Sequence, residues 1–268
     1  MVKETQRKGL GSTESRILSD LAAEGNVVFS IEELAQKTST RALARKMAST
    51  LSKKKWVERL SKGLYLILEL AAGSTPEWSE DSFYIASKLA QPYYIGYLSM
   101  LHYYSWTEQV PTTVTIATIK ITKPKTIHGT KYEFFTLSAK KFFGYKEVNI
   151  RGHNVIVSDA EKTLIDALDH PEYCGGIDEV KKAIAYAKVD WGKVIAYAES
   201  MGNGAIYKRL GFLLEEMNIP VSKEIIESLR RRLTTGYAPL YPTAGNNGKY
   251  NTRWNIQINT DISRGDLE

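Results

Sequence analysis

The chain has 268 residues, of which 43% are hydrophobic and 25% charged, a composition typical of a folded protein with two or three domains. Its net charge of +6 lies entirely in residues 1–67, which hold 13 Lys and Arg against 7 Asp and Glu, because the rest of the chain holds 23 of each. No apolar run approaches the roughly 20 residues that cross a bilayer, the first residues lack a secretory signal, and the single Cys174 excludes an intramolecular disulfide, so we expect a cytoplasmic protein.

The basic region begins with two short predicted helices. The first spans residues 13–24 and ends at Gly25, a residue type that commonly closes a helix in the left-handed conformation. Ser30 and Glu33 have the spacing of a capping box and predict the start of the second helix. Both helices have narrow apolar faces, which we expect to point inward: Ile17, Leu18, Leu21, Ile31, Leu34 and Ala35.

The third predicted helix, residues 41–54, follows a turn at residues 38–40 and contains no carboxylate. At about 100° per residue, Leu43, Met47 and Leu51 fall on one side, which we expect to be buried. The opposite side then holds only cations and small hydroxyls, with Lys46 at its edge: Arg41, Arg45, Ser49, Ser52 and Lys53. A helix with such a face is suited to the major groove of DNA, although a solvated surface helix has a similar composition.

A hairpin is predicted next, with strands at residues 56–60 and 64–67 joined by Ser61, Lys62 and Gly63. Helix, helix, basic helix and hairpin in this order indicate a winged helix-turn-helix over residues 1–70, followed by a linker at 71–80. We expect the following residues to contact DNA, the first three at the bases and the others at phosphates: Arg41, Arg45, Ser49, Lys46, Lys53, Arg59, Lys62 and Tyr65.

The body that follows the linker, residues 81–268, is predicted to be an α+β domain. Helices are expected at 81–90 and 93–106, strands at 112–118, 126–136 and 148–157, and mostly helix from a sub-boundary near 158 to 233. A last strand is expected at 254–258. The aromatic residues of 93–106 indicate either a hydrophobic core or a platform on which bases stack. The lysines of 120–131 indicate either a solvated edge strand whose charges prevent aggregation or a second nucleic-acid contact.

The sequence contains no strong catalytic motif. The four histidines have no metal-ligand spacing, and there is neither a phosphate-binding glycine loop nor a nucleophile elbow. Asp159, Glu161 and Lys162 resemble a nuclease metal site, but Ser158 and Glu161 also have the spacing of a capping box. We therefore expect no enzymatic activity, no metal and no cofactor.

Several short segments give the chain a resemblance to the AbiEi-type antitoxins of prokaryotic toxin–antitoxin systems. They occur in the expected order at residues 62–65, 93–99, 101–103, 107–111, 142–145, 158–166 and 171–176. The resemblance implies a winged helix that binds inverted repeats in the promoter of its own operon, and a C-terminal domain that counters a nucleotidyltransferase toxin.

Three hypotheses follow from the sequence. The first is a DNA-binding repressor that acts as an antitoxin, with double-stranded DNA and a nucleotidyltransferase toxin as partners and no membrane association. The second is a metal-dependent nuclease that the winged helix brings to DNA. The third is a stand-alone regulator whose body senses a small ligand.

Overall fold

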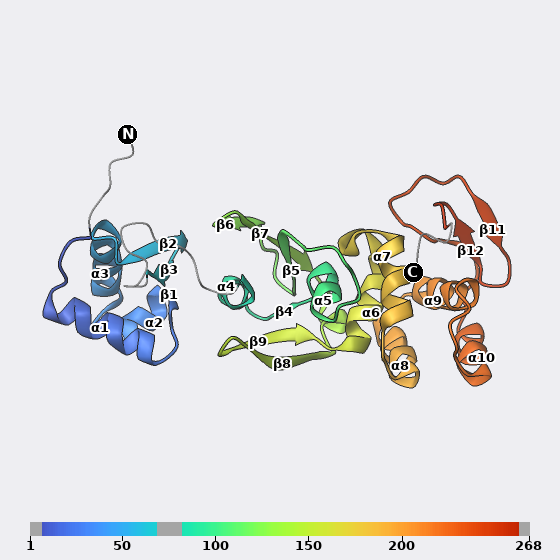
Figure 1. Cartoon of the computed structure of the whole chain (residues 1–268), viewed down its shortest axis with the longest axis horizontal. Coiled ribbons are helices and arrows are strands. Elements are labelled where there is room, and N and C mark those ends of the chain that lie inside the picture. The colour runs from blue at the N-terminus through green and yellow to red at the C-terminus, as the bar shows by residue number, and fades with distance from the viewer. Residues whose placement is uncertain (1–6, 69–81, 263–268) are drawn as a thin grey trace. The chain divides into compact units, whose positions relative to one another are not determined.

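The computed structural model describes residues 7–68 and 82–262, which form a mixed α+β protein (Figure 1). The chain divides into two compact units, the first reaching to Leu89 and including residues 150–153, the second comprising the rest. The predicted linker at 71–80 lies outside the described residues. The N-terminal unit therefore extends past the predicted limit at residue 70 and takes in the helix α4 (Ser82–Leu89).

The first unit contains a winged helix-turn-helix, as predicted. Three helices pack with a three-stranded antiparallel sheet of strand order β1-β3-β2. Their bounds are α1 (Ser12–Ala23), β1 (Val28–Ser30), α2 (Ile31–Gln36), α3 (Arg41–Lys53), β2 (Val57–Ser61) and β3 (Leu64–Ile67). The wing is the hairpin of β2 and β3, and β1 pairs with β3 to fix the wing to the helices.

Local sequence signals set the helix ends in this unit. Gly25 follows α1 with φ +74°, the left-handed conformation that its position predicted. The Ser30 hydroxyl accepts a hydrogen bond from the amide of Glu33 at 3.1 Å, and the Glu33 carboxylate accepts one from the amide of Ser30 at 2.6 Å. The predicted capping box at the start of α2 is therefore confirmed.

The predicted inner face of α3 is confirmed at Leu51, confirmed in part at Met47, which packs partly buried against the core, and wrong at Leu43. Leu51 is buried, but Leu43 is 47% exposed and Met47 only half-buried. Ala44 and Ala48 occupy the inward positions, and both are fully buried in the core of the unit. The spacing of Ala44, Ala48 and Leu51 places them on one helix face, just as the predicted spacing of Leu43, Met47 and Leu51 does. Because alanine is small, this face lets α3 approach its neighbours closely.

The second unit contains a six-stranded mixed sheet of order β6-β7-β5-β4-β9-β8. Its strands agree with the predicted strand regions after residue 112, with one addition: β4 (Tyr93–Ile95), β5 (Thr113–Thr118), β6 (Lys125–Ile127), β7 (Thr130–Thr136), β8 (Tyr145–Ile150) and β9 (His153–Ser158). β4 pairs antiparallel with β5 and parallel with β9, so it joins the two halves of the sheet.

The addition, β4, corrects the helix predicted at 93–106. Tyr93 lies opposite Thr118 in the sheet, and only the later residues form a helix, α5 (Tyr97–Tyr103). Gly96 separates the two with an extended backbone, φ −147° and ψ −164°. The prediction that these aromatic residues are core is confirmed for Tyr93 and Tyr97, which are 6% and 0% exposed.

The region 158–233 is mostly helical, as the sequence predicted. The helices are α6 (Ala160–Asp169), α7 (Ile177–Tyr186), α8 (Trp191–Met201), α9 (Gly204–Glu216) and α10 (Lys223–Arg231), with short 3-10 turns at Ala139–Lys141 and Pro171–Cys174. α6 contacts α5, α7, α8 and α9 (Figure 1). A small sheet of β10 (Ala238–Pro239), β11 (Lys249–Asn251) and β12 (Ile256–Ile258) follows, and β12 is the predicted last strand.

Candidate nucleic-acid interface

The exposed face of α3 is basic and lies opposite its alanine stripe. Lys46, Ser49 and Lys53 point away from Ala44, Ala48 and Leu51, and all three are exposed. Arg45 is exposed beside them. Within the part of the chain that the structure describes, Arg45, Lys46 and Lys53 have no ion-pair partner, so their charges are available to an external anion.

Two of the residues predicted to bind DNA have other partners in the structure. Arg41 is exposed at the start of α3 and forms an ion pair with Glu32 of α2. Tyr65 is only 9% exposed, and its ring stacks on Phe29 with centroids 5.8 Å apart. The structure therefore places Tyr65 in the core of the winged helix and away from the basic surface.

The wing adds two exposed cations. Arg59 and Lys62 lie at or beside the turn between β2 and β3, where Gly63 has φ +81°. The register of the hairpin shifts between Arg59 and Ser61, and the guanidinium of Arg59 donates a hydrogen bond to the carbonyl oxygen of Ser61 at 3.2 Å. This bond holds Arg59 close to the turn, so both wing cations sit at the tip of the hairpin.

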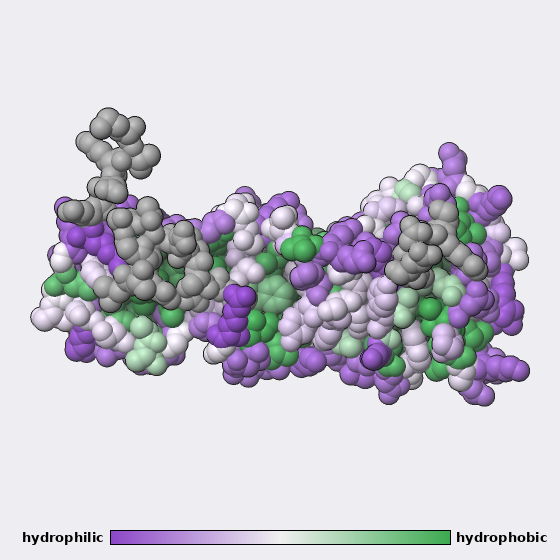
Figure 2. All heavy atoms as spheres, viewed as in Figure 1, coloured by the Kyte–Doolittle hydropathy of each residue, from purple (hydrophilic) through white to green (hydrophobic). Residues whose placement is uncertain are grey.

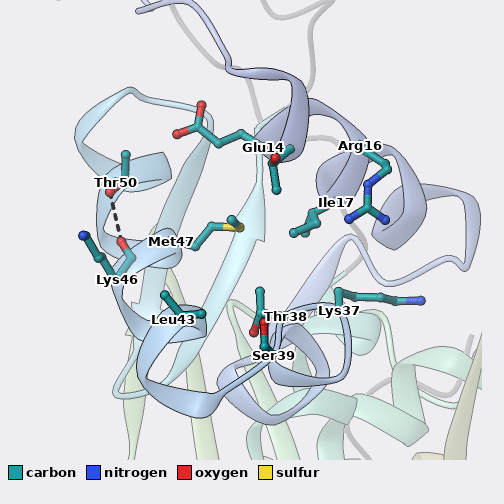
Figure 3. Close-up of a pocket in the computed structure, with 11 residues that line it drawn as sticks. Glu14, Arg16, Ile17, Lys37, Thr38, Ser39, Leu43, Lys46, Met47 and Thr50 are labelled. Carbon is teal, nitrogen blue, oxygen red and sulfur yellow. Dashed lines mark hydrogen bonds between the residues drawn. The ribbon is translucent and has the colours of Figure 1, made fainter.

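A groove of about 440 Å³ lies beside this face, between α1, the turn after α2, and α3 (Figure 3). Leu43 and Met47 of α3 and Ile17 of α1 line its apolar part, whereas Arg16 and Lys37 line the opposite side. Thr38, Ser39 and Thr50 add hydroxyl groups to its wall. The groove thus combines an apolar floor with a cationic rim next to the predicted recognition helix.

The carboxylates around the groove are held by other groups. Glu14 accepts hydrogen bonds from Lys54 at 2.6 Å and from the amide of Gly11 at 2.7 Å, and these bonds lower the pKa of the Glu14 carboxyl. Glu24 forms an ion pair with Lys37, and Asp20 one with Arg16 at 3.4 Å. These carboxylates therefore pair with Lys54, Lys37 and Arg16, and they leave Arg45, Lys46 and Lys53 of α3 without an ion-pair partner among the described residues.

The suspected nuclease residues do not converge on one site. Asp159 caps α6 by accepting a hydrogen bond from the amide of Lys162 at 2.8 Å, so the cap is Asp159 and the predicted capping box of Ser158 and Glu161 is wrong. Asp159 and Glu161 both contact Lys193, at 3.1 and 2.8 Å. These contacts raise the pKa of the Lys193 ammonium, and the hydrogen bond with Glu161 has the largest effect. Lys162 points into the core instead.

The core around Lys162 contains a charged network that sequence reasoning missed. Lys162 is fully buried, forms an ion pair with Asp166, and lies 3.0 Å from the hydroxyl of Tyr94. That hydroxyl donates a hydrogen bond to Asp166 at 2.8 Å. Lys162 and Asp166 are separated by one helical turn, which is the signal that could have identified the pair.

Among the described residues, no group of three or more His, Cys, Asp or Glu side chains is arranged to hold a metal ion. Within the same residues, none of the helices combines the length and apolar character needed to span a bilayer. The face shown in Figure 2 carries hydrophilic side chains between scattered apolar ones.

Comparison with known proteins relates this arrangement to one solved fold. No protein-family model matches the chain, and no curated protein matches it. Among solved structures, the chain is similar to the RV2827C protein from Mycobacterium tuberculosis, with a TM-score of 0.61 over 95% of this chain and 94% of that one. At 12% identity, this similarity shows that the two proteins share a fold.

Proposed function

We propose that the protein is a cytoplasmic, non-enzymatic DNA-binding repressor, and that it acts as the antitoxin of a prokaryotic toxin–antitoxin system. One observation carries the DNA-binding part of this proposal. The exposed surface of α3 holds Arg45, Lys46 and Lys53 without any carboxylate on the helix, and the wing beside it adds Arg59 and Lys62. Such a surface attracts the phosphates of a duplex and offers donors to base edges in the major groove.

The roles of the individual residues follow from where the side chains lie. Arg45 and Ser49 are suited to contact bases, because both are exposed on α3. The guanidinium of an arginine can also form two hydrogen bonds to the edge of one guanine. Lys46, Lys53, Arg59 and Lys62 are suited to phosphates as point or forked charges. Arg41 contributes less at the bases, because its ion pair with Glu32 must break or rearrange first.

Binding to the promoter of the protein's own operon tests this proposal. In a fluorescence anisotropy titration with the full chain, Arg45→Ala is expected to weaken binding to the promoter duplex by about 1–3 kcal/mol and to relax sequence preference. Lys62→Ala should weaken binding to all duplexes alike. Lys223→Ala provides the control, because Lys223 is an exposed lysine of α10 outside the proposed interface.

The result that would refute DNA binding is equally specific. If the Arg45→Ala and Lys62→Ala proteins bound the promoter as tightly as the unmodified protein and the Lys223→Ala protein, the assigned surface would not be the DNA-binding surface. If the unmodified protein failed to bind any duplex at low salt, the repressor proposal itself would fall.

The antitoxin part of the proposal rests on the resemblance of the body to the AbiEi-type family. In the structure, the resembling segments after residue 90 belong to the second unit, and several form its turns: Gly175 and Gly176, for example, have φ +86° and +105° between a 3-10 turn and α7. We therefore infer that these segments maintain the fold of the body. The test is co-expression with a toxic nucleotidyltransferase encoded beside this gene: restored host growth supports toxin neutralisation, and growth arrest despite normal expression of both proteins, or the lack of such a neighbouring gene, contradicts it.

A further inference from the structure

Leu43 is exposed in the first turn of α3, where a core residue was expected. Its side chain is 47% exposed and lines the groove of about 440 Å³ beside the helix (Figure 3). The amide of Leu43 donates a hydrogen bond to the hydroxyl of Thr40, the N-cap of α3, at 3.2 Å. This cap fixes the first turn of the helix, so the exposed leucine has a defined position.

The surroundings of Leu43 indicate an anionic duplex as the molecule that covers it. Ala42 and Ser49 are exposed on α3 and small, so they allow close approach to the helix. Lys46 lies three residues after Leu43, about one helical turn, and both residues line the groove. The Lys46 side chain points away from the centre of the groove (Figure 3). Leu43 is thus an exposed apolar side chain beside Lys46, a cation with no ion-pair partner among the described residues. A molecule that covers both side chains must present an apolar group next to negative charge.

Bases in the major groove provide that combination. In helix-turn-helix proteins, residues near the N-terminus of the recognition helix meet the base edges. Leucine has no donor or acceptor for a hydrogen bond, and the C5-methyl group of thymine is the apolar group that unmodified base pairs present in this groove. We propose that Leu43 is a specificity-determining residue that contacts a thymine methyl group of the operator. This inference rests on the proposed DNA-binding function.

Replacing thymine by deoxyuridine tests the contact directly, because deoxyuridine keeps every hydrogen-bonding group and lacks only the methyl. A preferred duplex is first selected from a random library with the full-length protein. Each thymine of that duplex is then replaced singly, and the affinities of the unmodified protein and of Leu43→Ala are measured by anisotropy. We expect at least one replacement to weaken the unmodified protein roughly fourfold, the effect of one buried methyl or methylene group.

Leu43→Ala should bind the thymine duplex about fourfold more weakly and show no further loss at that deoxyuridine. Lys53→Ala is the matched control on the same helix: it should weaken binding to both duplexes and keep the difference between them. Because the deoxyuridine series uses the unmodified protein, it remains informative whatever Leu43→Ala does to folding.

The outcomes separate this inference from the proposed function. Sequence-preferring binding without any deoxyuridine penalty, or with an equal penalty in Leu43→Ala, overturns the role of Leu43 and leaves the repressor proposal intact. Failure of the full-length protein to select any duplex overturns both.

Discussion

A lysine inside a protein core must have its charge compensated, and Lys162 is compensated within its own helix. It is fully buried, and its ammonium group is paired with Asp166 one turn further along α6. The hydroxyl of Tyr94 bridges the two charges, and the ammonium lies 5.1 Å from the ring centroid of Phe143. This network joins β4 to α6, so it links the sheet of the second unit to its central helix.

Replacing Lys162 by methionine keeps much of its volume and removes its charge. Asp166 would then stay charged without its cation or bind a proton, and either state costs free energy in a buried site. We expect Lys162→Met to lower the free energy of unfolding by about 3–5 kcal/mol. Urea unfolding followed by circular dichroism measures this change.

The double variant Lys162→Met with Asp166→Leu is the control for this expectation. Removing both charges leaves an apolar pair, which commonly stabilises a core as well as the ion pair did. Recovery of at least half of the lost free energy is expected in the double variant. If Lys162→Met alone unfolded at the same urea concentration as the unmodified protein, the network would not be holding β4 to α6.

At the scale of elements, the sequence identified most helix ends and turns because short-range chemistry determines them. The capping box of Ser30 and Glu33, the left-handed Gly25 and the wing turn at Gly63 are all local. The helix predicted at 93–106 failed because long-range pairing overrides local periodicity: β4 is held by β5 and β9, and β9 is some sixty residues away in the chain.

The candidate site was predictable in composition but not in orientation. The cations of α3 and of the wing could be chosen from charge alone, and Arg45, Lys46, Lys53, Arg59 and Lys62 are all exposed. The rotation of α3 about its axis could not be predicted from the sequence. Ala44 and Ala48 are the fully buried residues, although leucine and methionine are more hydrophobic and indicated a different inner face. The position of Tyr65 was predicted wrongly for a related reason. A strand of the wing has one face toward the core and one toward solvent, and Tyr65 lies on the core face, stacked on Phe29.

The cap of α3 offers a test that separates the stability of this helix from its proposed DNA contact. Thr40→Ala removes the acceptor for the amide of Leu43 and should lower the unfolding free energy of the first unit by about 1 kcal/mol. Thr40→Asp keeps an acceptor, and its charge suits a helix N-terminus, so stability should be retained. However, its carboxylate would repel phosphate.

Thermal unfolding and anisotropy together give the result. We expect Thr40→Asp to melt near the unmodified protein yet bind duplex DNA more weakly than Thr40→Ala does. Thr40→Ser, which keeps the hydroxyl, should match the unmodified protein in both measurements. Equal binding by the Asp and Ala variants would contradict the proposed approach of DNA to the N-terminus of α3.

At the scale of the whole molecule, the excess of positive charge lies at the N-terminal end of the first unit, which itself extends to Leu89. The excess of six positive charges lies in residues 1–67, and the winged helix is built from that part. Residues 68–268 together carry no net charge, and the second unit has its own sheet and its own core. The concentration of positive charge in residues 1–67 gives the winged helix most of the long-range attraction to a polyanion, which suits a molecule in which one unit binds DNA and the other a different partner.

This division predicts how salt should affect DNA binding. Four cations are assigned to phosphates: Lys46, Lys53, Arg59 and Lys62. When they bind, they displace counterions that were condensed on the DNA. A plot of log affinity against log salt concentration should therefore have a slope of about −3.6 per bound chain. Lys53→Ala should make that slope less steep by about 0.9, which a titration series at several salt concentrations measures.

The lysines of the body provide the comparison. Lys120 and Lys123 are exposed in the connection between β5 and β6, next to Ile121, which is 92% exposed. If the body makes no contact with the duplex, the double variant Lys120→Ala with Lys123→Ala should leave the slope unchanged, because no counterions are released there. A slope that becomes less steep by about 1.8 would instead assign this connection to the DNA interface and end the separation of roles between the two units.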